Sequence, residues 1–169
     1  MVLDMDGPDY NPPLYLEGEK LDDFWNNISK RYFEEEKLWL ENLLSLNEDA
    51  GFIFVFFHPT WYSIKSSRVA DAEIRREFWG DVFERYGVTA VLNGHDHYYH
   101  HAEHGGVHYV FTAGGGAPLY DTDAIQPETV KYKKIEHIMR IDVGLSETTM
   151  KAIDINGEII EEIVVNRRK

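Results

Sequence analysis

The sequence predicts an α/β fold in which a mixed sheet ends in an antiparallel meander. Two apolar runs, at 52–57 and 88–92, are bounded by turn-forming residues, which is typical of strands buried on both faces. Each run follows a segment with helical spacing of its apolar residues. Asn156-Gly157 joins two segments of alternating apolar residues, and this dipeptide is the strongest short-range indication of a hairpin. The expected order of strand, helix, strand, helix and strand followed by a meander indicates the α/β class.

Two helices are expected in the first half of the chain. The first spans about 20–46, with Trp39, Leu43 and Leu46 on one face and a break near Ser29. The second spans 70–86, and Gly87 is suited to end it. Its predicted apolar stripe consists of Ile74, Phe78, Val82 and Tyr86.

Further strands are expected in the second half of the chain. The apolar-rich segment 107–113 ends in three glycines, and the predicted meander consists of 137–143, 148–155 and 158–165. At the start of the chain, Val2-Leu3 indicates the end of a strand, and the proline-rich stretch 6–13 an irregular connection. Because no repeat, low-complexity tract or linker interrupts the chain, we expect residues 1–169 to form a single unit.

Composition excludes several classes of function. The chain has 169 residues, a net charge of −13 and no cysteine, so disulfides, zinc–thiolate sites and cysteine nucleophiles are excluded. The acidic charge argues against nucleic-acid binding, which requires a basic surface. No run approaches the roughly 18 apolar residues of a membrane span, so no membrane binding is expected. The first residues lack the basic start and apolar stretch of a signal peptide, which favours a cytoplasmic location.

Histidines follow both buried strands. His58 comes directly after the first strand, and the stretch NGHDHYYHH at 93–101 follows the second. Ligands of open α/β sheets bind beyond the carboxyl ends of strands, so a metal site is expected there. In an extended segment His95 and His97 point the same way, with Cα atoms roughly 6–7 Å apart. They could hold one ion together or each hold one of two ions about 3.5–4 Å apart, and spacing alone does not decide.

The stretches FFHPTWYS at 56–63 and NGHDHYYHH at 93–101 resemble the last two signatures of the calcineurin-like metallophosphoesterases, most closely the purple-acid-phosphatase-like branch. LWLENLL at 38–44 and HYVFTAGGGAPLY at 108–120 resemble the segments on either side of them. The resemblance implies a hydrolase with the C-terminal half of a four-layer α-β-β-α metallophosphoesterase domain. It implies a phosphomonoester or phosphodiester substrate and two divalent or trivalent ions of Mn, Fe or Zn.

Carried over position by position, the resemblance makes His58 and His95 ligands of one metal and His97 a ligand of the other. Arg68 lies where relatives often place histidines near the phosphate, and its guanidinium suits a bidentate phosphate contact. An arginine that is usual near the end of the second motif is replaced by His101. The other histidines in and after the motif, at 100, 101, 104 and 108, are expected on a solvated surface.

The family's earlier signatures, Asp-x-His, Gly-Asp and Gly-Asn-His, supply its bridging carboxylate and catalytic histidine. No histidine here has an aspartate two positions before it, Gly-Asn-His is absent, and the Gly-Asp at Gly80-Asp81 lies after His58, in the wrong order. Hard ions with only neutral imidazoles lack the anionic oxygen ligands that offset their charge. We therefore expect the missing N-terminal half of the domain to supply the carboxylates, and the isolated chain to be inactive. The alternative is a non-catalytic structural or interaction module.

Half of such a domain would expose an apolar sheet face, which soluble monomers rarely tolerate. We therefore expect homodimerisation through that face, or aggregation.

Overall fold

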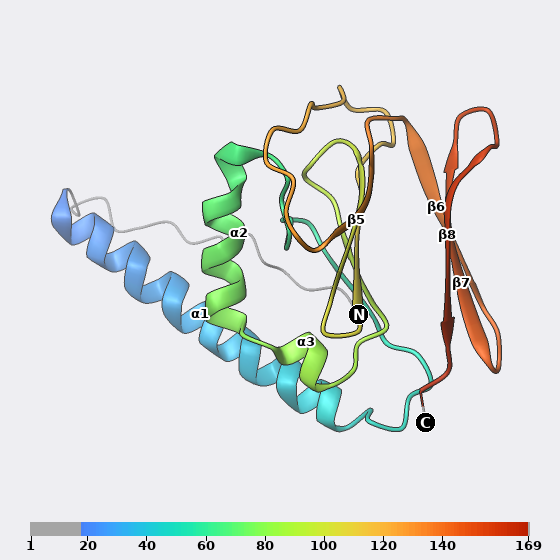
Figure 1. Ribbon diagram of the computed structural model, residues 1–169. Coiled ribbons are helices and arrows are strands. Elements are labelled where there is room, and N and C mark those ends of the chain that lie inside the picture. Colours follow the sequence, from blue (N-terminus) through green and yellow to red (C-terminus); the bar gives the residue numbers. More distant parts are fainter. Residues whose placement is uncertain (1–17, 169) are drawn as a thin grey trace. The chain divides into compact units, whose positions relative to one another are not determined.

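The computed structural model describes residues 18–168 (Figure 1). They divide into two compact parts, and the boundary in the sequence lies between Glu48 and Asp49. The described portion of the first part is mainly helix α1, Glu19–Ser45. The predicted break near Ser29 is wrong, because α1 is one continuous helix of 27 residues that contains neither glycine nor proline. The expected strand end at Val2-Leu3 and the connection at 6–13 lie outside the described residues. The single unit over 1–169 stays a prediction.

A five-stranded mixed sheet forms the centre of the second part, with strand order β1-β2-β4-β3-β5. Strands β1, β2 and β4 run parallel, whereas β3 pairs antiparallel with both β4 and β5. The bounds of these strands are β1 Phe54–Phe57, β2 Ala90–Asn93, β3 Tyr99–His104, β4 Val107–Thr112 and β5 Thr129–Lys133. The predicted strands at 52–57, 88–92 and 107–113 are confirmed, and β3 and β5 were not predicted. Burial of the first run on both faces is wrong for Phe56, which is 37% exposed on β1 at the end of the strand order.

Two helices lie where one was predicted: α2, Ser66–Trp79, and α3, Val82–Arg85. The separation occurs at Gly80, whose φ of 64° is a left-handed conformation that ends α2. The predicted stripe is therefore wrong in part: Ile74 is 64% exposed, and Trp79 is buried instead. The helix stop at Gly87 is confirmed, with a φ of 59° and an N–H that donates to the Glu84 carbonyl.

The predicted meander forms a separate three-stranded antiparallel sheet of β6, His137–Val143, β7, Glu147–Asp154, and β8, Ile159–Asn166. The Asn156-Gly157 turn is confirmed, because Gly157 has a φ of 83° and its N–H donates to the Asp154 carbonyl. Ala152 pairs with Glu161 but Ile153 pairs with Ile159, so Ile160 is an extra residue that forms a β-bulge in β8.

The second part has three layers, with α2 and α3 on one side of the five-stranded sheet and the three-stranded sheet on the other (Figure 1). Between the sheets lies an apolar core that includes Leu92, Tyr99 and Val110 from one sheet and Met150 and Ile163 from the other. On the helical side, the aromatic rings of Phe57, Trp61, Phe83 and Tyr109 pack together. This α/β arrangement agrees with the predicted fold class. Among the described helices, none has both the length and the apolar character needed to cross a membrane.

Candidate metal centre

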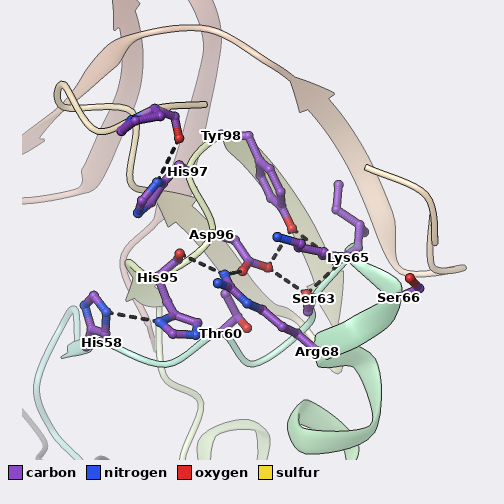
Figure 2. A network of polar contacts seen from close by, with 12 residues as sticks. His58, Thr60, Ser63, Lys65, Ser66, Arg68, His95, Asp96, His97 and Tyr98 are labelled. Atoms are coloured by element: carbon purple, nitrogen blue, oxygen red, sulfur yellow. Dashed lines mark hydrogen bonds and ion pairs between the residues drawn. The ribbon is translucent and has the colours of Figure 1, made fainter. Parts of the chain in front are cut away.

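His58 and His95 meet at the carboxyl ends of two neighbouring parallel strands. Phe57 of β1 pairs with Asn93 of β2, so the residues that follow these strands emerge side by side. His95 Nδ1 lies 3.2 Å from His58 Nε2, and the two rings stand nearly perpendicular (Figure 2). Two of the three predicted metal ligands are therefore brought together by the register of the sheet.

The backbone between the strand and the histidine pair has two unusual positions. A side chain at Gly94 would place its Cβ 3.0 Å from His58 Nδ1, so glycine allows the ring to approach. His95 has a φ of 66°, and it is the only non-glycine residue with a positive φ in the described chain. Such a conformation costs roughly 1–3 kcal/mol and is concentrated at functional sites. The strain at His95 is an independent indication that its side chain has a role.

His97 is held by a different segment. Its Nδ1 lies 2.9 Å from the Pro118 carbonyl oxygen, and its ring stacks on Tyr120 with centroids 4.3 Å apart. A carbonyl can only accept, so Nδ1 carries the hydrogen and the neutral ring has its lone pair on Nε2. This is the tautomer in which metal-binding histidines are commonly fixed by a backbone carbonyl.

Asp96, between the two histidines of the motif, faces the interior and is completely buried. Its Oδ2 accepts hydrogen bonds of 2.6 Å from both Ser63 Oγ and Tyr98 OH, and its Oδ1 contacts Arg68 (Figure 2). Burial, reinforced by the Asp96 charge, raises the pKa of Tyr98, so this phenol remains a donor. The carboxylate therefore fixes the loop that presents His95 and His97. Asp96 was not predicted as a site residue, although an acidic residue between two histidines after a buried strand is a usable signal.

Arg68, predicted to bind substrate, lies at the start of α2 and is 22% exposed. Its Nη1 contacts Asp96 and also donates to the His95 carbonyl at 2.9 Å. Its guanidinium carbon lies 5.2 Å from the centre of the Tyr120 ring. Arg68 thus connects α2 to the histidine loop.

The electrostatics of the pair favour a neutral imidazole at His95. Burial lowers its pKa, and the positive charge of Arg68 lowers it further. A neutral ring offers a lone pair to a metal at neutral pH. The donor set fits a hard metal pair only in part, because the nearby carboxylate of Asp96 is directed inward and occupied by hydroxyl and guanidinium donors.

The expectation of a solvated surface for the remaining histidines of the motif is wrong at two positions. His100 and His101 are 0% and 3% exposed, because they lie within β3 rather than in a loop. The ring of His100 stacks on Phe111 with centroids 4.8 Å apart. The polar stretch 99–104 was expected on the surface, but it forms β3, an internal strand of the sheet.

Comparisons with known proteins identify a family and a shared fold. Residues 4–99 of the chain match the calcineurin-like phosphoesterase family. GAP50, the anchor in the inner membrane complex of Plasmodium, has a similar fold, with a TM-score of 0.73 and 18% identity over 83% of this chain. The purple acid phosphatase PPD1 from seeds of yellow lupin, Lupinus luteus, has a TM-score of 0.69 and 16% identity over 78% of this chain.

The matched region is less than half of either solved structure, 44% of GAP50 and 28% of PPD1. The search of curated proteins gives no match. The family match covers more than half of the sequence and includes His58, His95 and His97. The chain belongs to the calcineurin-like phosphoesterase family.

Proposed function

We propose that this chain supplies the histidine ligands of a two-metal phosphoesterase centre, with His58 and His95 on one ion and His97 on the other. The observation that carries the proposal is the 3.2 Å separation of His95 Nδ1 and His58 Nε2. Two imidazole nitrogens of a tetrahedral metal are about 3.3 Å apart when each bond is 2.0–2.1 Å long. Bound metal ions of the Mn, Fe or Zn type would polarise the phosphoester and activate a water molecule.

The anionic ligands of this centre must come from elsewhere. Three neutral imidazoles do not offset the charge of two ions, and the sequence has none of the family's carboxylate signatures in the required order. We infer that a polypeptide segment with Asp-x-His, Gly-Asp and Gly-Asn-His completes the site, and that this chain alone hydrolyses phosphoesters at background rates. Arg68 would contact the phosphate from the partly exposed side of its guanidinium.

A non-catalytic interaction module is the second candidate. The missing carboxylate signatures favour it, as does the fold shared with GAP50, which is an anchor in the inner membrane complex of Plasmodium. In that case the histidine motif would be retained for the packing of its loop by Asp96 and Arg68.

Hydrolysis of p-nitrophenyl phosphate and bis-p-nitrophenyl phosphate with Mn²⁺ tests the two candidates. The chain is assayed alone and after fusion to a family segment that carries the three missing signatures. The phosphoesterase proposal expects activity only in the fusion, and loss of that activity in His58→Ala and His95→Ala but not in His104→Ala, a change of an exposed histidine. A folded fusion that binds Mn²⁺ but has no activity would favour the interaction module.

We also propose that the outer face of the three-stranded sheet forms a homodimer contact. Ile138 and Ile159 both pair with Ile153, so these side chains form a cross-strand row, and Ile138 and Ile159 are 64% and 53% exposed. Sedimentation at micromolar concentration is expected to give a dimer that Ile138→Lys dissociates. A wild-type monomer would exclude this contact.

A further inference from the structure

A second group of side chains of the types that bind metals lies away from the candidate centre. His101 and Glu103 occupy alternate positions of β3, and Glu103 pairs directly with His108 of β4. Residues two apart on a strand, and residues paired across strands, project from the same face of a sheet. The three side chains therefore converge, and their ligand atoms all lie within 4.8 Å of one another.

This group lies at the opposite end of the sheet from the candidate centre. His108 pairs with Ala90 at the beginning of β2, whereas His95 follows the end of that strand. His97 likewise precedes β3, whereas Glu103 is close to its end. The two groups are thus separated by the length of the strands and cannot share one ion.

The two imidazoles have a separation that suits a metal. His101 Nε2 lies 3.0 Å from His108 Nδ1. Nitrogens bound to one tetrahedral Zn²⁺ are about 3.3 Å apart, so a shift of a few tenths of an ångström would admit the ion. Without a metal, one ring must donate a hydrogen to the other at this distance.

Glu161 of β8 orients His101. Its Oε1 lies 3.2 Å from His101 Nδ1, and its Oε2 accepts a 2.8 Å hydrogen bond from Tyr99 OH. An ionised carboxylate can only accept, so the hydrogen of neutral His101 is on Nδ1 and the lone pair on Nε2 is directed at His108. A carboxylate behind a histidine that presents its other nitrogen is the usual outer shell of a zinc ligand.

The charges of the group agree with metal binding. Burial raises the pKa of Glu161, but hydrogen bonds from His101 and Tyr99 outweigh it, so the pKa lies below its ordinary value and the carboxylate is ionised. Burial lowers the pKa of His108. Glu103 is exposed and supplies an anionic oxygen.

We propose that His101 Nε2, His108 Nδ1 and the Glu103 carboxylate form a mononuclear site for Zn²⁺, with Glu161 as the residue that positions His101. Two nitrogens and one oxygen are a ligand set that zinc accepts, and a water molecule would complete the tetrahedron on the exposed side of Glu103. This site is independent of the proposed phosphoesterase centre. Bound zinc would join β3 to β4 and, through Glu161, to the second sheet.

Calorimetric titration of Zn²⁺ into the full chain, without a histidine tag and after treatment with EDTA, tests the proposal. A background variant with His58→Ala and His95→Ala removes the candidate centre. The expected result is one Zn²⁺ bound by this background variant, and a loss of affinity of at least tenfold when His108→Gln is added. His104→Gln, a change of an exposed histidine on the same strand β3, is the matched control and should leave the affinity unchanged.

Circular dichroism establishes whether each variant is folded. If His108→Gln is unfolded, Glu103→Gln takes its place, because it alters only an exposed side chain, and the same loss of affinity is expected. Absence of Zn²⁺ binding in the background variant would overturn the proposal, as would binding that neither His108→Gln nor Glu103→Gln weakens. Either result would identify His101 and His108 as a hydrogen-bonded pair. Neither result would contradict the proposed phosphoesterase centre, because His58 and His95 are absent from the background variant.

Discussion

The two histidine groups of this protein are built in different ways. The loop histidines, His58, His95 and His97, follow the ends of β1 and β2, where the backbone is irregular and His95 has a left-handed conformation. The strand histidines, His101 and His108, lie within β3 and β4, where ordinary cross-strand pairing sets their spacing. A loop can orient a side chain in many directions, but its backbone must be fixed by other contacts. A strand sets the orientation of each side chain with an unstrained backbone.

Each group also depends on one carboxylate, which is the fully buried Asp96 in the first group and the partly buried Glu161 in the second. Asp96 is adjacent in sequence to the histidines that it fixes, and it acts on the backbone of their loop. Glu161 is 60 positions from His101, and it acts directly on the ring nitrogen. The first carboxylate should therefore matter mainly for stability, and the second mainly for the affinity of a metal. Substitutions at Asp96 and Glu161 test this difference, and substitutions at His100 and His95 test the strand and loop positions themselves.

The largest effect is expected for Asp96→Ala. Removing the carboxylate leaves Arg68 without its ion-pair partner and the hydroxyls of Ser63 and Tyr98 without their acceptor. Breaking a buried pair in this way costs about 3–5 kcal/mol, to be measured as the free energy of unfolding in urea. The control is Asp142→Ala, which removes an exposed pair with Arg140 and should cost less than about 1 kcal/mol. Equal losses in both variants would show that the loop does not depend on Asp96.

The second effect concerns His100, which lies between the two groups and packs on Phe111. Burial lowers its pKa from 6.5 to about 3. The unfolded chain thus binds a proton between these values while the folded protein does not, and stability falls as the pH falls from about 6.5 towards 3. The free energy of unfolding should therefore be about 2 kcal/mol lower at pH 5 than at pH 7.

His100→Gln should remove that part of the acid sensitivity, and urea unfolding at pH 7 and pH 5 measures it. His104→Gln, a change at an exposed position of the same strand, should keep the wild-type difference between the two pH values. If His100→Gln loses as much stability at pH 5 as the wild type, the buried ring does not resist protonation.

The third effect is on metal affinity. Glu161→Gln should weaken Zn²⁺ binding by the strand histidines by about 10–100-fold, because the amide cannot hold the His101 tautomer as a carboxylate does. Glu162→Gln changes the next residue, which pairs with Lys151 instead, and should leave the affinity unchanged. Calorimetry in the His58→Ala, His95→Ala background measures both. An equal effect of the two variants would contradict the positioning role of Glu161.

The smallest effect is expected for His95→Asn. Asparagine adopts a positive φ more readily than histidine, so the substitution should leave the free energy of unfolding unchanged or raise it by up to about 1 kcal/mol. Metal binding by the loop histidines should decrease in the same variant, while binding by the strand histidines persists. A marked loss of stability would mean that the His95 ring is needed for packing rather than retained for function.

Much of this architecture could be predicted from the sequence where the signal is local. The apolar run of β2 and the turn-forming dipeptide Asn156-Gly157 are signals contained within a few residues, and both elements were predicted correctly. Strand β3 was not predicted, because histidines occupy both of its faces and conceal the alternation that identifies a strand. The division between α2 and α3 depends on the conformation of Gly80, which resembles a tolerated glycine within a helix until its φ is known.

The same distinction applies to the site. His58 and His95 follow apolar strands, and their proximity follows from parallel pairing. The position of Asp96 between two histidines is a local signal, but its partner Ser63 lies 33 positions away. Glu161 lies 60 positions from His101, and no local pattern indicates its role.

Because Ile160 is an extra residue in β8, the consecutive side chains of Ile160 and Glu161 both point towards the space between the two sheets. Ile160 belongs to the apolar core between the sheets, while Glu161 beside it reaches Tyr99 and His101. In a regular strand, neighbours alternate sides and one of the two would face solvent. Deletion of Ile160 would therefore restore regular pairing but remove an apolar side chain from the core beside the carboxylate that contacts His101.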